Sequence, residues 1–368
     1  MKVVLATTGY PPDRIGGVET VVALLAKELP KLGYETHVIT RLWHQRVRVA
    51  GVTQLPVPRG EALGLASFGG LATAIVGKEV PDVLHCHGLE GAMLCNYPRL
   101  TKAREIFHLH TPFTRKEFLN TLPHRMGNRI LARACFSADL VLCPSQAAKE
   151  DALRYLPGID PGKVTVLHNP VMTQPPADIF ELASLRKVLK LEDKKVILFV
   201  GKLRPEKGIE DICRAYQLLG RDDTRLLVVG AVGGRLFYEH LRRTFPDVIF
   251  TGFVANPLVY YQISDLFCIY SSGFESGESF AITLAQALMM GVPVVCADNH
   301  IFREVTGGHA SFAPPRNPGR LSLALEDVLT HHEEARLRAN AGARLAKEEY
   351  SLQNFMKRVI SIYRRVSG

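Results

Sequence analysis

The sequence predicts an α/β protein with two doubly wound parallel-sheet domains that face a central cleft. Three observations support this prediction. Short apolar runs alternate with stretches whose apolar residues have helical spacing, which is typical of a parallel sheet covered by helices on both faces. The alternation is interrupted at 169–180, a stretch rich in proline and polar residues, and then starts again. A chain of 368 residues is also too long for one ordinary core.

The individual elements are assigned from the same two patterns in chain order. In the first half we expect strands at 2–7, 35–40, 82–87, 105–110, 139–144 and 164–169, and helices at 18–32, 62–77, 116–135 and 145–156. In the second half we expect strands at 195–201, 225–231, 248–253, 265–270 and 292–297, and two terminal helices within 332–366. The predicted domains are 1–172 and 173–350, and the last helix, 351–368, is expected to cross back to the first domain.

Composition narrows the class of protein. The net charge of +9 favours partners that carry phosphate or another anion. Nucleic acid is disfavoured as a partner, because the sequence has no recognised nucleic-acid module and no basic tail. The first apolar run is too short for a signal peptide and no run approaches the roughly 20 residues of a membrane span, so a cytoplasmic protein is expected. The seven cysteines are scattered, which favours buried thiols over disulfides or structural zinc.

The first candidate site is Gly16-Gly17, between the first strand and the first helix. Ligands of open α/β sheets bind at the carboxyl ends of strands, and the free N–H groups at a helix start suit an anion. An ordinary turn with a helix cap explains the two glycines equally well.

Two pairs of histidines form the second candidate. His85 and His87 share one side of a predicted strand, and so do His108 and His110. His87 and His110 are expected nearest the cleft, where an imidazole can hydrogen-bond a sugar hydroxyl or a phosphate, whereas His85 and His108 are expected to pack inside the sheet. No metal is expected, because no carboxylate motif of a familiar metal enzyme accompanies the four rings.

The third and fourth candidates follow strands of the second domain. Gly201 is followed by Lys202, Arg204 and Lys207, and cations concentrated in one strand-to-helix loop form a diphosphate clamp. A solvated basic loop is the alternative, mainly for Arg204. In the fourth candidate, Glu278 precedes a helix that is expected to begin near 280.

The helix of the fourth candidate has two expected functions. The N–H groups of Phe280, Ala281 and Ile282 would face a phosphate, and Glu278 would accept a bond from a sugar hydroxyl. Gln286 is polar on an otherwise apolar helix, so its amide either reaches a ligand or is satisfied inside the protein.

These segments resemble the large retaining glycosyltransferase family 4, whose members have the two-domain GT-B fold with Rossmann-like domains. The resemblance runs along nearly the whole chain. Four segments resemble, in order, the amino-terminal glycine motif, the phosphate-clamp motif, the segment near the base and the E-x7-E signature: YPPDRIGGVET (10–20), VGKLRPEKG (200–208), GFVANPLVYYQISDLFCIYSS (252–272) and ESFAITLAQALMMGVPVV (278–295).

The resemblance implies a role for each matching residue. His110 contacts the transferred sugar, Lys202 and Lys207 hold the diphosphate, Glu278 approaches the sugar and position 286 meets the ribose. The implied catalytic set is His110, Glu278, Lys202 and Lys207, and the implied donor-binding set is Gly16, Gly17, Gly201, Arg204, Val254, Phe280, Ala281, Ile282 and Gln286.

Three residues depart from the family pattern. Lys202 stands where the family usually has Arg, which keeps the charge but loses the bidentate fork. Ala281 replaces the usual Gly and narrows the room for a phosphate. Gln286 replaces the second Glu of the signature and loses a charged acceptor for the ribose hydroxyls. Weaker or altered donor binding is expected rather than lost chemistry, because Glu278 is retained.

The family implies a metal-independent, retaining transfer from a UDP-, GDP- or ADP-sugar, with no cofactor. The acceptor is a soluble sugar or sugar phosphate, or a lipid-linked glycan. Five cations at 115–133 would suit a peripheral contact with an anionic membrane, although a solvated outer helix face explains them as well: Arg115, Lys116, Arg125, Arg129 and Arg133. A nucleotide-sugar-binding protein without transferase activity, a nucleotide-sugar epimerase and a phosphorylase are the alternatives.

Overall fold

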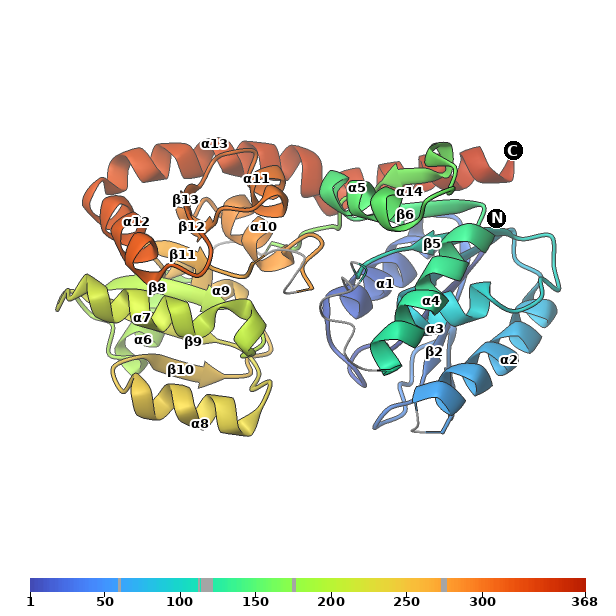
Figure 1. The fold of residues 1–368 in the computed structure, drawn as a ribbon, viewed down its shortest axis with the longest axis horizontal. Coiled ribbons are helices and arrows are strands. Elements are labelled where there is room, and N and C mark those ends of the chain that lie inside the picture. The colour runs from blue at the N-terminus through green and yellow to red at the C-terminus, as the bar shows by residue number, and fades with distance from the viewer. Residues whose placement is uncertain (59–60, 112, 114–121, 174–176, 273–276) are drawn as a thin grey trace. The chain divides into compact units, whose positions relative to one another are not determined.

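The chain divides into two compact units in the computed structural model (Figure 1). The structure describes residues 1–58, 61–111, 113, 122–173, 177–272 and 277–368. Unit 1 comprises Met1–Pro170 and Gln353–Gly368, and unit 2 comprises Val171–Leu352. These limits lie close to the predicted boundaries at 172 and 350.

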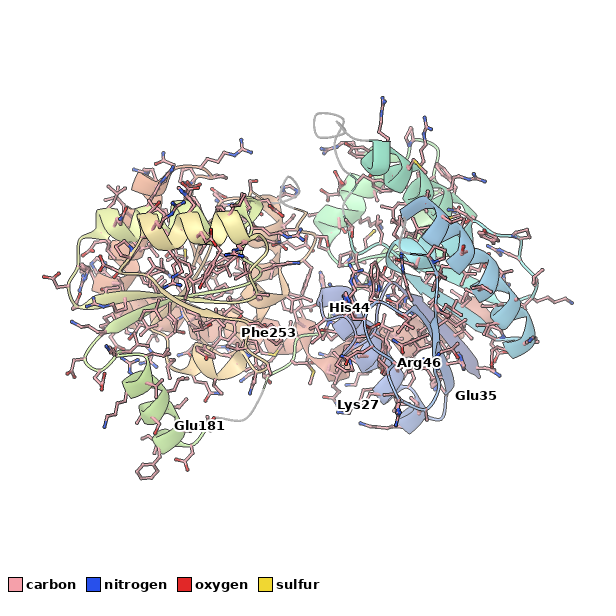
Figure 2. All side chains as sticks on the ribbon, turned by 90° about the horizontal axis from the view of Figure 1, so that it is seen from below. Lys27, Glu35, His44, Arg46, Glu181 and Phe253 are labelled. Carbon is pink, nitrogen blue, oxygen red and sulfur yellow. The ribbon has the colours of Figure 1, made fainter. Side chains whose placement is uncertain are left out.

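Unit 1 contains a parallel sheet whose described strands run in the order β3-β2-β1-β4-β5-β6-β7. Its strands are β1 (Lys2–Thr7), β2 (Glu35–Arg41), β3 (Val52–Leu55), β4 (Val83–His87), β5 (Arg104–His108), β6 (Leu140–Cys143) and β7 (Val164–Val166). Its helices are α1 (Gly17–Glu28), η1 (Pro30–Leu32), α2 (Glu61–Glu79), α3 (Gly88–Cys95), α4 (Leu122–Ser137), α5 (Gln146–Tyr155), η3 (Pro161–Lys163) and α14 (Leu352–Ser367). Figure 2 labels Lys27 on α1 and Glu35 at the start of β2.

Unit 2 contains a second parallel sheet with the strand order β10-β9-β8-β11-β12-β13. Its strands are β8 (Lys195–Val200), β9 (Thr224–Val229), β10 (Ile249–Gly252), β11 (Leu266–Ile269), β12 (Val294–Ala297) and β13 (Ser311–Ala313). Its helices are α6 (Ile179–Val188), η4 (Pro205–Lys207), α7 (Ile209–Leu219), α8 (Arg235–Thr244), α9 (Leu258–Gln262), α10 (Ile282–Met289), α11 (His300–Thr306), α12 (Pro318–Thr330) and α13 (His332–Tyr350).

The two doubly wound sheets confirm the predicted fold class. Central strands such as β1 and β8 are buried along almost their whole length, which is why they appear in the sequence as continuous apolar runs. The sequence missed β3 and β13, because β3 is a half-buried edge strand with polar Thr53 and Gln54, and β13 has only three residues. All seven cysteines are buried, as expected.

The last helix belongs to unit 1. The hydroxyl of Tyr363 on α14 lies 2.7 Å from Nδ1 of His85 on β4, and both side chains are fully buried. In the described part of the chain, no helix combines the length and apolar character needed to cross a membrane.

Candidate functional site

The predicted diphosphate clamp of unit 2 lies beside the start of α10. The Nζ of Lys207, in η4 after β8, forms an ion pair with the carboxylate of Glu278, just before α10. Their side chains are 24% and 14% exposed, so the pair is largely shielded from water. The structure therefore brings together a cation, a carboxylate and a helix N-terminus whose first N–H groups lack intrahelical partners.

Two glycines allow the clamp loop to lie against its neighbours. Gly208 has a φ of 70°, and a Cβ at this position would overlap the carbonyl oxygen of Tyr270 at the end of β11. Gly230 has a φ of 151°, and a Cβ there would overlap the carbonyl oxygen of Gly201. The backbone N–H of Leu203 then donates to the Ala231 carbonyl at 2.9 Å. Gly230 and Ala231 therefore support the clamp loop from the end of β9.

The two other cations of the clamp loop face solvent. Lys202 and Arg204 are both exposed. Arg204 lies 3.5 Å from Glu206, whereas none of the described carboxylates forms an ion pair with Lys202. An ammonium group that has no internal partner is available to an anionic ligand.

The start of α10 differs from the prediction. The helix begins at Ile282 rather than near Phe280, because Ala281 adopts a left-handed conformation with φ 40° and ψ 68°. Glycine adopts the left-handed conformation without steric cost, whereas the Cβ of another residue raises the conformational energy by roughly 1–2 kcal/mol. Phe280 is buried, and its ring packs edge-on against Tyr350 with centroids 5.1 Å apart. The Phe280 N–H therefore lies outside the helix that was expected to present it.

Gln286 lies on the half-buried side of α10, together with Ile282 and Thr283. Its Oε1 is 3.5 Å from the hydroxyl of Tyr261, which also lies 3.1 Å from the Thr283 carbonyl oxygen. The amide thus has a weak internal partner on a helix side that is still open to a ligand. Val254, at the predicted base site, is half-buried shortly after the end of β10.

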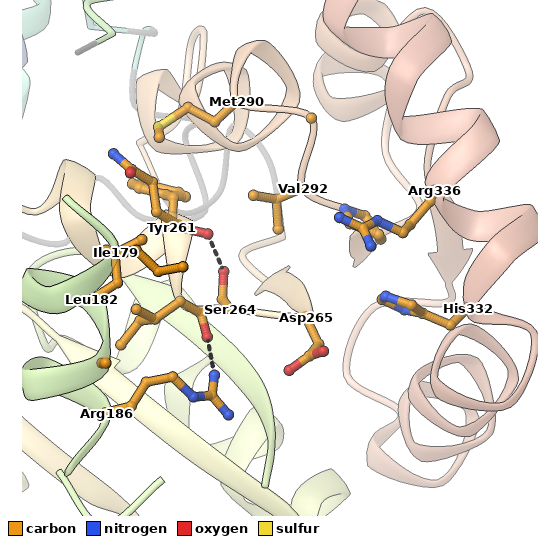
Figure 3. Close-up of a pocket in the computed structure, with 15 residues that line it drawn as sticks. Ile179, Leu182, Arg186, Tyr261, Ser264, Asp265, Met290, Val292, His332 and Arg336 are labelled. Carbon is orange, nitrogen blue, oxygen red and sulfur yellow. Dashed lines mark hydrogen bonds between the residues drawn. The ribbon is translucent and has the colours of Figure 1, made fainter. Parts of the chain in front are cut away.

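A hollow of about 450 Å³ lies elsewhere in unit 2 (Figure 3). Asp265 and Pro293 line it at the amino ends of β11 and β12. Arg186, also in its wall, donates to the Ile263 carbonyl at 2.8 Å. Ligands of open α/β sheets bind at the opposite, carboxyl edge, so this hollow is separate from the candidate donor site.

The glycine motif of unit 1 begins α1. Gly16 is the N-cap and Gly17 the first helical residue, and Gly17 is exposed. Arg14, just before them, forms an ion pair with Glu19 at 3.0 Å. A Cβ on Gly16 would lie 2.5 Å from Oε2 of Glu19, so the glycine gives this ion pair room.

The four histidines form one buried cluster on β4 and at the end of β5. The register pairs His87 with His108, and the His108 and His110 rings stack with centroids 3.9 Å apart. Nδ1 of His87 lies 3.0 Å from Nε2 of His110. Among the described residues, His85, His87 and His108 also form a group whose potential metal-ligand atoms lie within 4.8 Å of one another. The expectation that no metal binds here stays a prediction.

Burial keeps this cluster neutral. Burial lowers the pKa of His110 to about 3, and burial together with the His110 charge lowers the pKa of His85 to about 3. Burial and the neighbouring rings also hold the pKa values of His87 and His108 well below the usual range. His110 is therefore a neutral imidazole at pH 7, able to donate one hydrogen bond and accept another.

The cluster predicts that acid destabilises unit 1. Histidines with lowered folded pKa values contribute stability that is complete above the unfolded pKa of about 6.5 and is lost as the pH falls towards the folded value. From pH 7 to pH 6 the expected loss is about 0.7 kcal/mol per histidine. Glu105 opposes it, because burial raises its pKa to about 7. We expect a net loss of about 2 kcal/mol in the free energy of unfolding.

Urea unfolding at the two pH values tests this prediction. Fluorescence of Trp43, the only tryptophan in the chain, reports on unit 1. His108→Gln should lose less stability on acidification than the wild type does. His331→Gln, at an exposed position of unit 2, should behave as the wild type. Equal wild-type stability at pH 6 and pH 7 would contradict the prediction.

The predicted basic helix corresponds to α4. Arg125, Arg129 and Arg133 are exposed and recur at helical spacing, so they share one side of the helix. Arg115 and Lys116 lie outside the described residues. A membrane contact through this side stays a prediction.

Two family models match the chain and together span most of it. The model of Glycosyltransferase Family 4 matches residues 15–174, and the model of Glycosyl transferases group 1 matches residues 183–345. The chain belongs to glycosyltransferase family 4. It is accordingly a transferase, as predicted.

Relatives within the family align along nearly the full length of the chain. An uncharacterized glycosyltransferase of Methanocaldococcus jannaschii is 25% identical, over 99% of this chain and 98% of its own. The alpha-maltose-1-phosphate synthase of Mycolicibacterium smegmatis is 24% identical over 100% of both chains. The phosphatidyl-myo-inositol mannosyltransferase of the same organism is 25% identical, over 98% and 92%.

Solved structures place the fold of this glycosyltransferase in the GT-B class. The crystal structure of Anabaena Alr3699/HepE with UDP and glucose has a TM-score of 0.83 and 17% identity, covering 98% of this chain and 99% of its own. WaaG, a glycosyltransferase involved in lipopolysaccharide biosynthesis, has a TM-score of 0.79 and 16% identity, with 98% and 99% covered.

Sequence reasoning did not identify the structural role of Asp13, a buried carboxylate of unit 1. Asp13 accepts hydrogen bonds from the backbone N–H groups of Trp43, His44 and Gln45, at 2.8, 2.7 and 2.9 Å. Burial acts to raise the pKa of Asp13, but these bonds outweigh it and lower the pKa. The only signal in the sequence was an Asp in a proline-rich turn, which does not reveal a partner 30 residues away.

Proposed function

We propose that this glycosyltransferase moves a sugar from a nucleotide diphosphate sugar to an acceptor hydroxyl, with retention of configuration and without a metal ion or cofactor. The contact of Lys207 with Glu278 at the start of α10 carries the proposal. The ammonium group and the helix N-terminus suit a diphosphate, and the carboxylate suits sugar hydroxyls. One small region of unit 2 thus presents donors for the leaving group and an acceptor for the sugar.

In the proposed reaction the acceptor hydroxyl attacks C1 of the sugar on the side from which the diphosphate leaves. The bond from C1 to the diphosphate oxygen breaks, and the departing diphosphate takes the acceptor proton. Lys202, Lys207 and the first N–H groups of α10 stabilise the negative charge that develops on the diphosphate. His110 contacts the transferred sugar as a neutral imidazole.

The names of relatives and neighbours support a choice of substrates to test. A neighbour has been solved with UDP-glucose and a relative is named a GDP-mannose-dependent alpha-mannosyltransferase, so UDP-, GDP- and ADP-sugars are the donors to compare. Relatives are also named for maltose-1-phosphate and for phosphatidyl-myo-inositol. We propose a sugar or lipid-linked acceptor for this chain.

A melting-temperature screen of these donors with EDTA present tests the proposal. One nucleotide series is expected to stabilise the protein, because the clamp binds the diphosphate through Lys202, Lys207 and α10 rather than through a metal. Gln286→Glu should tighten binding about 10-fold, since a carboxylate accepts two charge-assisted ribose bonds. Gln217→Glu, at an exposed position of α7, is the matched control and should bind as the wild type.

The other outcomes separate the alternatives. No stabilisation by any donor at millimolar concentration would contradict the proposal. Stabilisation by a donor without transfer to any acceptor would identify a nucleotide-sugar-binding protein. Donor turnover in the absence of an acceptor would identify an epimerase.

A further inference from the structure

The hollow of about 450 Å³ in unit 2 falls within the range of ligand pockets, roughly 300–1,000 Å³ (Figure 3). We call it the α6 hollow, and its lining includes Ile179, Leu182, Ala183, Val292, His332 and Arg336. It lies at the amino ends of β11 and β12, whereas the diphosphate clamp follows the carboxyl end of β8 in the same sheet. A ligand in the α6 hollow therefore occupies a site separate from the donor site.

Two nitrogen-bearing side chains of α13 point into the α6 hollow without a partner. Figure 3 shows His332 and Arg336 extending from α13 toward Asp265 and Val292. Nδ1 of His332 is buried and has no hydrogen-bond partner among the described residues. None of the carboxylates that the structure describes forms an ion pair with Arg336. A buried polar group without a partner lowers stability, and a ligand that supplies acceptor atoms would satisfy both side chains.

The other charged groups of the lining are bound by the protein itself. The carboxylate of Asp265 accepts from the Val196 N–H at 2.8 Å and lies 3.9 Å from Nζ of Lys195. Arg186 donates to three backbone carbonyls at 2.6 to 2.8 Å. Burial and the charge of Lys195 lower the pKa of His332, so its ring is neutral at pH 7. Two guanidinium groups and one carboxylate leave the lining with one net positive charge, which suits a ligand with a single negative charge.

An apolar wall lies across the α6 hollow from Arg336. Ile179 and Leu182 of α6 form this wall, and Figure 3 shows both on the side opposite Arg336. Ile179 is 75% exposed, so a large part of its surface is open to an apolar ligand. Val292 adds a buried apolar side chain between the two ends. The hollow thus has one apolar end and one cationic end, and a ligand that matches it is amphipathic.

We propose that the α6 hollow binds a small organic carboxylate with an apolar body. The guanidinium group of Arg336 donates paired hydrogen bonds to the carboxylate, and the neutral imidazole of His332 donates a further bond. The apolar body lies against Ile179 and Leu182. A phosphate monoester fits less well, because it carries close to two negative charges at pH 7 and Asp265 repels the second.

Fluorine NMR of the full chain tests the proposal. The probe is 4-(4-fluorophenyl)butyrate, the neutral control is the corresponding amide, and the phosphate control is 4-fluorophenyl phosphate. The fluorine signal of the carboxylate should broaden saturably, the amide should bind about 10-fold more weakly, and added salt should weaken binding of the carboxylate. No saturable broadening, equal binding of the carboxylate and the amide, or tighter binding of the phosphate would overturn the proposal.

Paired variants locate the probe in the α6 hollow. Arg336→Gln should weaken probe binding about 10-fold without lowering the melting temperature, because Arg336 is exposed and unpaired among the described residues. Arg344→Gln, at an exposed position of the same helix outside the hollow, is the matched control. Ala183→Trp should abolish binding by filling the hollow from the exposed side of α6, whereas Ser184→Trp, exposed and outside the lining, should not.

The remaining outcomes show whether the probe binds elsewhere. Lys207→Met removes a cation of the diphosphate clamp and should leave probe binding unchanged. Weaker binding in this variant would assign the probe to the clamp, and equal weakening by Arg336→Gln and Arg344→Gln would show a general effect of charge. Either result would overturn the proposal. No nucleotide sugar is needed for these measurements, so their outcome is independent of the proposed transferase function.

Discussion

Lys207→Met is expected to weaken binding of the stabilising nucleotide sugar about 100-fold, roughly 2.7 kcal/mol. The change removes the cation that pairs with Glu278 just before α10 and leaves the largely buried carboxylate of Glu278 without this partner. Both effects weaken binding of the diphosphate, because the site loses a positive charge and keeps an uncompensated negative charge. Isothermal titration with the donor identified by the melting screen measures the effect.

Two further variants show whether Lys207 binds the donor or only neutralises Glu278. If Lys207 only neutralises Glu278, adding Lys207→Met to Glu278→Gln should cause no further loss of donor affinity, and that result would contradict the clamp role. We expect the double variant to bind the donor more weakly than Glu278→Gln alone. Lys187→Met, at an exposed position of α6, is the matched control and should bind as the wild type.

Gly230→Ala is expected to destabilise unit 2 by more than about 3 kcal/mol. Two costs add at this position. The φ of 151° is essentially restricted to glycine, and the new Cβ would overlap the Gly201 carbonyl oxygen, which is backbone and cannot rotate away. Relief requires the clamp loop to move, so donor affinity should fall together with stability. Scanning calorimetry reports the stability of unit 2, where Trp43 gives no signal.

Gly234→Ala is the matched control for this steric argument. Gly234 belongs to the same glycine-rich turn, but its φ of −168° is ordinary extended backbone and a Cβ there has no neighbour within 4 Å. Gly234→Ala should lower the free energy of unfolding by only about 1 kcal/mol, because Gly is favoured over Ala at an N-cap. Similar destabilisation by both substitutions would show that the close approach of Gly230 to Gly201 has no special role.

Much of the fold could be predicted because buried parallel strands impose a continuous apolar run on the sequence. The strands at 2–7 and 195–200 illustrate this, since almost every residue in them is buried. The edge strand β3 left no such signal, because half-buried residues tolerate Thr53 and Gln54. The start of α10 was misplaced because propensity does not reveal that Ala281 would adopt a left-handed conformation.

The sequence also identified most residue types of the donor site but not their contacts. Motif spacing indicated Lys207 and Glu278 separately, and the ion pair between them depends on two loops that are 71 residues apart in the chain. Side chains alternate between the two faces of a strand, so the sequence predicted that the two histidines of each pair lie on the same face. The register that sets His87 opposite His108 is a property of the sheet, so only the folded chain could form the neutral cluster.

Local sequence therefore determined the two parallel sheets, the boundaries of most elements and the chemical types of the donor-binding groups, because these depend on periodicity, turn residues and short motifs. The close approach of Gly230 to Gly201 and the bonds of Asp13 to the backbone of 43–45 needed the tertiary structure. Each of these contacts joins two separate segments of the chain. No periodic pattern in a single sequence indicates which segments will meet in this way.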